Sequence, residues 1–203
     1  MSSATAAFYF DLASPLAYMA AERVLHVLPG PAEWLPVLGR ELPGGQAAGS
    51  SRRAKDSPPA RSQLERRALE LGLQPLRWPD PFPFDSSLAM LVATYAKAIG
   101  RAVPFAQAAF RQAFAGGRSL EDPDSVLIAA AACEMHPSAV LRAAALRSTA
   151  ERLAASTAAA GAAGVTEVPA LRVGAEARVF FGDQAVEQAA EYMRGEPIGG
   201  PRP

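Results

Sequence analysis

The residue pair Ser14–Pro15 follows directly on an apolar run, Ala6 to Leu12, and is the first place in the chain where chemistry is expected. Serine is a good helix N-cap and proline suits the first helical position, so a helix is predicted to begin here. The first turn of a helix has unpaired N–H groups and a partial positive charge, which favour an anion. Ser14 is not expected to be a nucleophile, because no His or Asp lies at a triad-like spacing. Two roles stay open for Ser14: helix cap, or hydrogen-bond donor to a bound group.

The other reactive side chains are few and scattered. Cys133 is the single cysteine, so neither an internal disulfide nor a CxxC pair can form. It lies in an alanine-rich helical run and is interpreted as a small buried hydrophobe. His26 and His136 are far apart in the sequence, and with one cysteine they do not make a metal site. No metal is therefore predicted, and both histidines are interpreted as structural.

The elements expected to position Ser14 form a strand–helix–strand unit. The run from Ala6 to Leu12 is apolar at nearly every position, which is typical of a strand buried on both faces. A helix is predicted from Ser14 to Leu28, where a Pro-Gly-Pro sequence stops it, and a second short strand from Glu33 to Leu38. The stretch 39–59 is rich in Gly, Ser, Arg and Pro and is interpreted as a loop.

A long helical block follows, and the strand signal returns only near the C-terminus. Capping residues and glycine stops predict five helices in this block. They are Gln63–Leu71, Asp85–Ile99, Pro104–Ala115, Pro123–Met135 and Pro137–Gly164, with a break near Ser148 in the last. Ala170–Val173 and Arg178–Phe181 then predict a hairpin, and Asp183 can cap a final helix.

The predicted order is therefore βαβ, a helical block, then ββα, and the first and last pieces can share one mixed sheet. This α/β arrangement is the layout of thioredoxin-like proteins of the DsbA type, which carry a helical lobe inserted between two halves. We place the thioredoxin-like domain at residues 1–58 and 165–195 and the α-helical lobe at 59–164. Residues 196–203, rich in Pro and Gly, form a tail with little reason to order.

Composition narrows the classes of partner. The formal net charge is zero and no long basic run occurs, so nucleic-acid binding is not expected. The N-terminal residues do not read as a signal peptide, and no stretch has the length of a membrane-spanning helix. The single cysteine fits a reducing compartment, and a cytoplasmic location is expected.

Three segments carry a resemblance to a known family. Phe8–Tyr18 (FYFDLASPLAY), Gly164–Leu171 (GVTEVPAL) and Phe180–Gln184 (FFGDQ) resemble 2-hydroxychromene-2-carboxylate isomerases and kappa-class glutathione transferases. The length and the order of elements are also similar, so the resemblance covers nearly the whole chain. It implies that glutathione is the cofactor and that Ser14 stabilises its thiolate, since a free thiol ionises only above neutral pH.

The resemblance also implies the glutathione-binding residues. Pro169 would be a cis-proline, although the sequence alone favours a trans bond and a plain strand-start proline. The backbone of Val168 would pair with glutathione as an added strand edge. Asp183 and Gln184 would hold its γ-glutamyl end, although the residues alone favour a helix cap as the role of Asp183. Lys55 would match a lysine of the family.

Several positions depart from the pattern of this family. Pro59 and Gln63 stand where the family has a tyrosine and an aspartate, and Gln184 and Ala185 stand where it has an aspartate and an arginine. Three functions are therefore kept. The first is a glutathione-dependent isomerase acting on an aromatic or apolar electrophile; the second is a kappa-class-like glutathione transferase. The third is a non-catalytic thioredoxin-like binding domain with a degraded glutathione site.

These functions predict different features. Either enzyme would have an open apolar cleft between sheet and lobe, with Ser14 and Pro169 at its floor. The binding domain would have a filled one. Disulfide exchange is not expected, because no cysteine lies near Ser14. A homodimer is plausible from the family alone.

Overall fold

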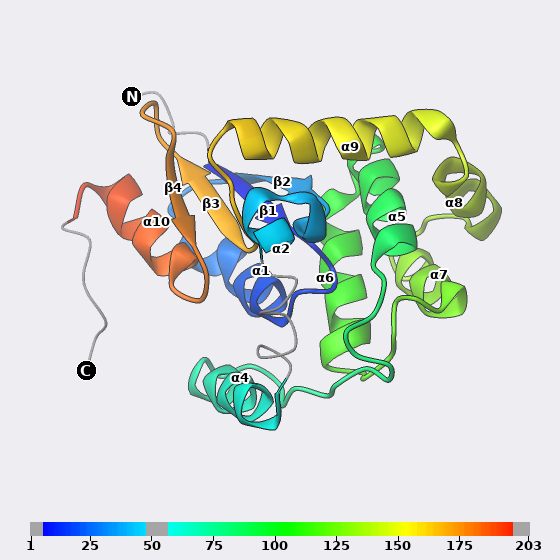
Figure 1. Ribbon diagram of the computed structural model, residues 1–203, viewed down its shortest axis with the longest axis horizontal. Coiled ribbons are helices and arrows are strands. Elements are labelled where there is room, and N and C mark those ends of the chain that lie inside the picture. Colours follow the sequence, from blue (N-terminus) through cyan, green and yellow to red (C-terminus); the bar gives the residue numbers. More distant parts are fainter. Residues whose placement is uncertain (1–5, 48–56, 197–203) are drawn as a thin grey trace.

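Four strands form the sheet of the computed structural model, which describes residues 6–47 and 57–196 (Figure 1). The strands are β1 (Ala6–Phe10), β2 (Ala32–Pro36), β3 (Ala170–Val173) and β4 (Arg178–Phe181). Their order is β2-β1-β3-β4, with β1 parallel to β2 and β3 antiparallel to both β1 and β4. The predicted α/β fold, with both ends of the chain sharing a mixed sheet, is confirmed.

Strand β1 is apolar throughout because both of its faces are covered. On one face Phe8 and Phe10 are fully buried, and Phe8 packs edge-on against Trp34 of β2 with ring centroids 4.9 Å apart. On the other face Tyr9 joins a second apolar cluster with Val37, Leu42, Ala160, Val165 and Ala170. In a strand buried on both sides no position faces solvent, so polar residues do not alternate with apolar ones. This explains the near-continuous hydrophobic sequence of β1.

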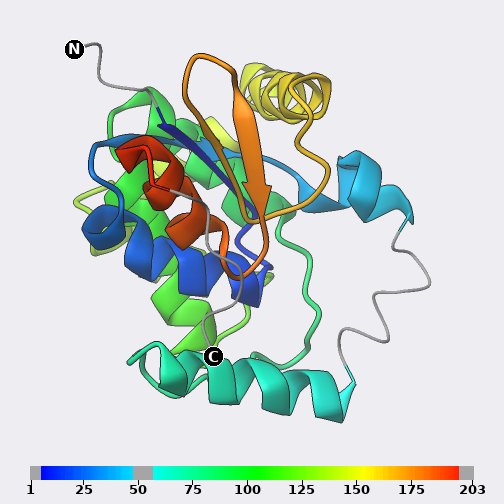
Figure 2. The ribbon, with the colours of Figure 1, turned by 90° about the vertical axis from the view of Figure 1, so that its left-hand side faces the viewer.

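The helices pack on this sheet and beside it (Figures 1 and 2). Helix α1 follows β1 and contacts α10, which follows β4, while α5 and α6 contact β2. Helix α9 runs along the other side of the sheet and contacts β2. The bounds are α1 (Pro15–Val27), η1 (Gly39–Glu41), α2 (Pro43–Ala47), α4 (Pro58–Glu70), α5 (Ser87–Ala98), α6 (Ala102–Phe114), α7 (Pro123–Ala131), α8 (Pro137–Ala144), α9 (Arg147–Ala162) and α10 (Ala185–Arg194).

Several predicted boundaries were wrong. The region after β2 is not all loop, since η1 and α2 occupy residues 39–47. The alanine-rich run breaks at Ala145–Leu146, close to the predicted break near Ser148, and α9 ends at Ala162, whereas α4 begins at Pro58 and not at Gln63. Alanine favours helix at every position, so composition alone does not show where such a run breaks.

The N-caps of α10 and α5 are not the aspartates at which the sequence places the starts of these helices. Asp183 does not cap α10: the N-cap is Gln184, which makes no side-chain cap hydrogen bond. Ser86 is the N-cap of α5, although the Asp85 carboxylate accepts a hydrogen bond from the Ser87 N–H at 3.0 Å. Asp122 caps α7, since its carboxylate accepts hydrogen bonds from the Asp124 and Ser125 N–H groups. Among the described helices, none is long and apolar enough to cross a membrane.

Candidate active site

Ser14 is the N-cap of α1, with Pro15 at the first helical position. Its hydroxyl oxygen accepts a hydrogen bond from the Ala17 N–H at 3.1 Å, and its side chain is half-buried. The cap role is therefore confirmed. Because the oxygen accepts in this bond, the hydroxyl hydrogen is left to donate to another group.

The first turn of α1 has few donors left. Pro15 has no N–H, the Ala17 N–H is bonded to Ser14 Oγ, and the Tyr18 N–H donates to the Ser14 carbonyl at 3.0 Å. Within the described part of the chain, the Leu16 N–H makes no hydrogen bond. This helix start thus offers one hydroxyl and one backbone N–H to an anion, helped by the helix dipole.

Strand β3 runs antiparallel to β1, so Pro169, which precedes β3, lies at the same end of the sheet as the loop that leads to Ser14. The register pairs Tyr9 with Ala170, so the chain leaving β1 toward Ser14 passes the residues that enter β3. The Val168–Pro169 peptide bond is cis, as the family resemblance implied. No hydrogen bond within the described residues uses the Val168 N–H or C=O, so its backbone is available to a ligand.

Asp11 links the β1–α1 loop to the η1 turn and, through Gly39, to the segment that precedes β3. Its side chain is 6 % exposed. One carboxylate oxygen accepts from the Ala13 N–H at 3.0 Å and the other from the Gly39 N–H at 2.8 Å. Gly39 in turn lies against Val168, since a Cβ added there would be 3.1 Å from Val168 Cγ2. The sequence signal that marks Asp11 is an acidic residue directly after a buried apolar strand.

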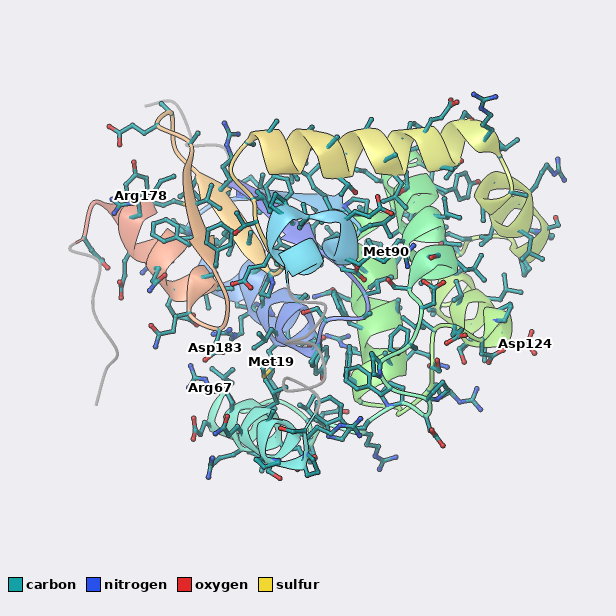
Figure 3. All side chains as sticks on the ribbon, viewed as in Figure 1. Met19, Arg67, Met90, Asp124, Arg178 and Asp183 are labelled. Atoms are coloured by element: carbon teal, nitrogen blue, oxygen red, sulfur yellow. The ribbon has the colours of Figure 1, made fainter. Side chains whose placement is uncertain are left out.

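Asp183 is engaged in ion pairs. Its Oδ2 lies 2.6 Å from Arg67 Nε on α4, and its Oδ1 lies 3.7 Å from Arg23 Nη2 on α1. Arg23 also donates to the Asp183 carbonyl at 2.8 Å and pairs closely with Glu187. Figure 3 shows Arg67 reaching from α4 toward Asp183. The predicted cap role is wrong because these guanidinium groups hold the carboxylate away from the helix N–H groups.

The ion pair with Asp183 also affects the pKa of Arg67. Partial burial on its own would lower the pKa of the guanidinium, but hydrogen bonding and attraction to Asp183 and Glu70 raise it. The charges of Arg67 and Asp183 are therefore held together, and Asp183 is already partnered. Nothing in the sequence pattern pointed to Arg67, which lies 116 positions away from Asp183.

The other two predicted binding residues have different outcomes. Gln184 is half-buried at the start of α10, and its side chain makes no hydrogen bond with another described residue. Its amide is therefore free to meet a ligand. Lys55 lies outside the described residues, so its role stays a prediction.

A cavity of about 230 Å³ lies between η1, α5 and α9. Leu38, one of its lining residues, directly precedes Gly39, whose N–H donates to Asp11. The cavity therefore begins beside the η1 turn. Arg40 at its rim is hydrogen-bonded to Asp85 at 2.6 Å and to the Ser87 hydroxyl at 2.9 Å. Neither Ser14 nor Pro169 lines this cavity, so the expected cleft with these two residues at its floor is not this space. The lining residues are Leu38, Arg40, Glu41, Ser87, Leu91, Ala150, Leu153 and Ala154.

Comparisons with known proteins identify the family and the fold. The family described as DSBA-like thioredoxin domain matches residues 5–194. A search of curated proteins finds none with significant sequence similarity to the chain. Among solved structures, 2-hydroxychromene-2-carboxylate isomerase (HCCA isomerase) superimposes with a TM-score of 0.82 at 18% identity, covering 94% of this chain and 95% of that one.

Two disulfide-exchange proteins are also similar. A probable DsbA oxidoreductase from Streptomyces coelicolor gives a TM-score of 0.74 at 20% identity, covering 98% of this chain and 93% of that one. The cytosolic disulfide reductase DsbM from Pseudomonas aeruginosa, solved with GSH, gives 0.66 at 12% identity, with 94% and 96% covered. At such identities the likeness shows the fold, and the chemistry has to be argued from the residues of the site.

Proposed function

Because this chain belongs to the DSBA-like thioredoxin domain family, we propose that it is a glutathione-dependent isomerase acting on an aromatic or otherwise apolar electrophile. The observation that carries the proposal is the half-buried Ser14 hydroxyl at the start of α1, together with the cis Val168–Pro169 bond that leads into the neighbouring strand β3. The fold likeness to HCCA isomerase supports the reaction class, and the DsbM structure with GSH supports the cofactor.

The residues present fit a bound peptide thiol. The Ser14 hydroxyl and the Leu16 N–H supply two donors to a sulfur anion, and the dipole of α1 favours the negative charge there. The unengaged backbone of Val168 can pair with an extended peptide, as strand addition requires. Asp183 uses Oδ2 for Arg67 and its Oδ1 makes no hydrogen bond with a described residue, so we assign the γ-glutamyl end to Asp183 and Gln184, with Lys55 as a further contact.

Isomerisation by reversible addition needs a nucleophile that is also a good leaving group. Glutathione, when bound, supplies a thiolate that adds reversibly to a conjugated double bond and so permits rotation before it is eliminated. Ser14 holds the negative charge on sulfur before addition and after elimination. A kappa-class-like transferase would use the same residues and would differ in leaving glutathione attached to its product.

Disulfide exchange is the alternative that the DsbA and DsbM likenesses raise. It needs a reactive thiolate, and the single cysteine of this chain is Cys133, which follows α7 in the helical lobe. Cys133 is 6 % exposed, and burial raises the pKa of its thiol despite the opposing charge of Arg101. We therefore propose that the protein does not reduce insulin, and insulin reduction by the purified protein would overturn this.

The proposal is tested by calorimetry and by thiolate absorbance. We expect glutathione to bind at or below millimolar concentration and to ionise more readily when bound. Ser14→Ala should weaken binding about fivefold, from the loss of one hydrogen bond, and raise the pKa of the bound thiol. Ser14→Thr keeps the hydroxyl and the cap and should behave like the parent protein.

A control separates this effect from loss of a cap. Asp122→Ala removes the cap of α7, which costs stability as Ser14→Ala does, but it should leave glutathione binding unchanged. No glutathione binding to the parent protein would overturn the proposed function. Binding without any isomerase or transferase turnover would favour the non-catalytic binding domain.

A further inference from the structure

Asp11 connects two segments of the chain at the candidate site through its side chain. Its two carboxylate oxygens accept from two different chain segments, the β1–α1 loop at Ala13 and the η1 turn at Gly39. Its own carbonyl accepts from the Ser14 N–H at 3.0 Å. A single residue therefore holds both the backbone of Ser14 and the turn that faces it.

The Gly39 end of this link reaches the other side of the site. A Cβ at Gly39 would lie 3.1 Å from Val168 Cγ2 and 3.3 Å from Asp11 Oδ2, so these groups are packed with no spare room. The Gly39 backbone thus packs directly against the Val168 side chain, so a displacement of Gly39 is transmitted to Val168. Hydrogen bonds to a buried carboxylate are about twice as strong as neutral ones, which makes the Asp11–Gly39 link stiff.

We infer that Asp11 is a positioning residue that sets the relative placement of the Ser14 hydroxyl and the Val168 backbone. The inference rests on the proposed function, which assigns the Ser14 hydroxyl to the thiol of glutathione and the Val168 backbone to its peptide backbone. A ligand that spans two fixed points binds well only when their separation is held in the free protein. Asp11 provides that preorganisation without touching the ligand.

The test is Asp11→Asn. The amide has the same shape as the carboxylate but only one acceptor oxygen, so its NH2 group must face one of the two backbone N–H donors. We expect the Kd for glutathione to rise about tenfold, while near-ultraviolet circular dichroism shows a folded protein.

Asp122→Asn is the matched control. The Asp122 carboxylate also accepts two backbone N–H bonds, from Asp124 at 3.1 Å and Ser125 at 3.2 Å, but at the start of α7. We expect its Kd to stay within about twofold of the parent value. A role for Asp11 in stability alone would lower the unfolding midpoints of both variants and leave both Kd values unchanged, and that result would overturn the inference.

A second measurement does not depend on glutathione. In the free protein, Asp11→Asn should shift the backbone amide resonances of Ser14 and Val168 and speed hydrogen exchange at Gly39. If only Ala13 and Gly39 respond, Asp11 does not position the site and the inference fails. If these amides respond but the parent protein binds no glutathione, the proposed function fails while the positioning role stands.

Discussion

At the scale of single residues, the candidate site depends on groups that serve more than one partner. Ser14 uses its oxygen lone pair to cap α1, which leaves its hydroxyl hydrogen to donate to another group. Asp11 uses both oxygens on backbone N–H groups and so connects the Ser14 loop to Gly39. Asp183 pairs with Arg67 through Oδ2 and lies near Arg23 through Oδ1, an oxygen without a hydrogen-bond partner among the described residues.

Tyr18, one turn into α1, gives a pH prediction. Burial raises the pKa of its phenol, the nearby Glu22 carboxylate adds to the effect, and Arg111 opposes it. The folded protein then keeps this proton at a pH where the unfolded chain, with an ordinary tyrosine pKa of about 10, has lost it. The Tyr18 contribution is therefore present below about pH 10 and is lost as the pH rises through the folded-state value.

This expectation is checked with urea unfolding midpoints measured from about pH 8 to about pH 11. The parent protein should lose stability across this range, and Tyr18→Phe should show a shallower decline. Equal slopes for the two proteins would contradict the assignment to Tyr18.

At the scale of elements, α4 differs from the other helices in how it is held. Ala68 is the single fully buried residue among its described positions. Its attachments are mainly polar: Arg67 to Asp183, Glu65 to the Trp78 indole N–H at 2.6 Å, and Arg61 stacked 4.9 Å from the Trp78 ring. Figure 2 shows α4 lying across one end of the molecule, outside the main helical layers.

The position of α4 should therefore respond to a single charge change. Arg67→Met removes the ion pair with Asp183 and keeps most of the apolar stem. We expect faster hydrogen exchange across Pro58–Glu70, by about threefold to tenfold, with little change in global stability because both partners are partly exposed.

Arg147→Met is the control for this effect. Arg147 pairs with Glu151 within α9 at 2.8 Å and is 91% exposed, so this pair joins no two elements. It should leave exchange in α4 unchanged. Unchanged exchange in Arg67→Met as well would mean that the apolar contacts of Leu64 and Leu71 are enough to hold α4.

At the scale of the whole molecule, the sheet and the helical lobe share one core. Phe10 of β1 packs against Phe110 of α6 with ring centroids 5.9 Å apart, and Phe110 also meets Tyr18 of α1. The main apolar cluster continues from β1 through α5, α6 and α7 without a polar boundary. The lobe is an insertion in the sequence but not a separate packing unit.

This continuity predicts a single unfolding transition. Phe110→Ala removes a fully buried ring from the shared core and should destabilise the protein by about 3–5 kcal/mol. Near-ultraviolet dichroism, to which Trp34 in the sheet contributes, and far-ultraviolet dichroism, dominated by helix, should lose signal at the same urea concentration. Two separate midpoints would show that the lobe unfolds independently.

Most of the fold follows from local patterns. The apolar run before Ser14, the serine–proline helix start and the late hairpin predict β1, α1, β3 and β4, because capping and strand burial depend on residues close in sequence. Helix ends in the alanine-rich region did not follow, because alanine has no preference that marks a stop.

The sequence by itself determined that one cysteine is present, that Ser14 begins a helix and that β1 is buried on both faces. Only the tertiary structure decided what surrounds Ser14. Asp11 meets Gly39 across 28 positions and Asp183 meets Arg67 across 116. Such pairs form when distant segments are brought together by the sheet register and by helix packing. Side-chain charge and hydropathy show that a residue can pair, but the partner is set by which backbone segments the fold places beside it.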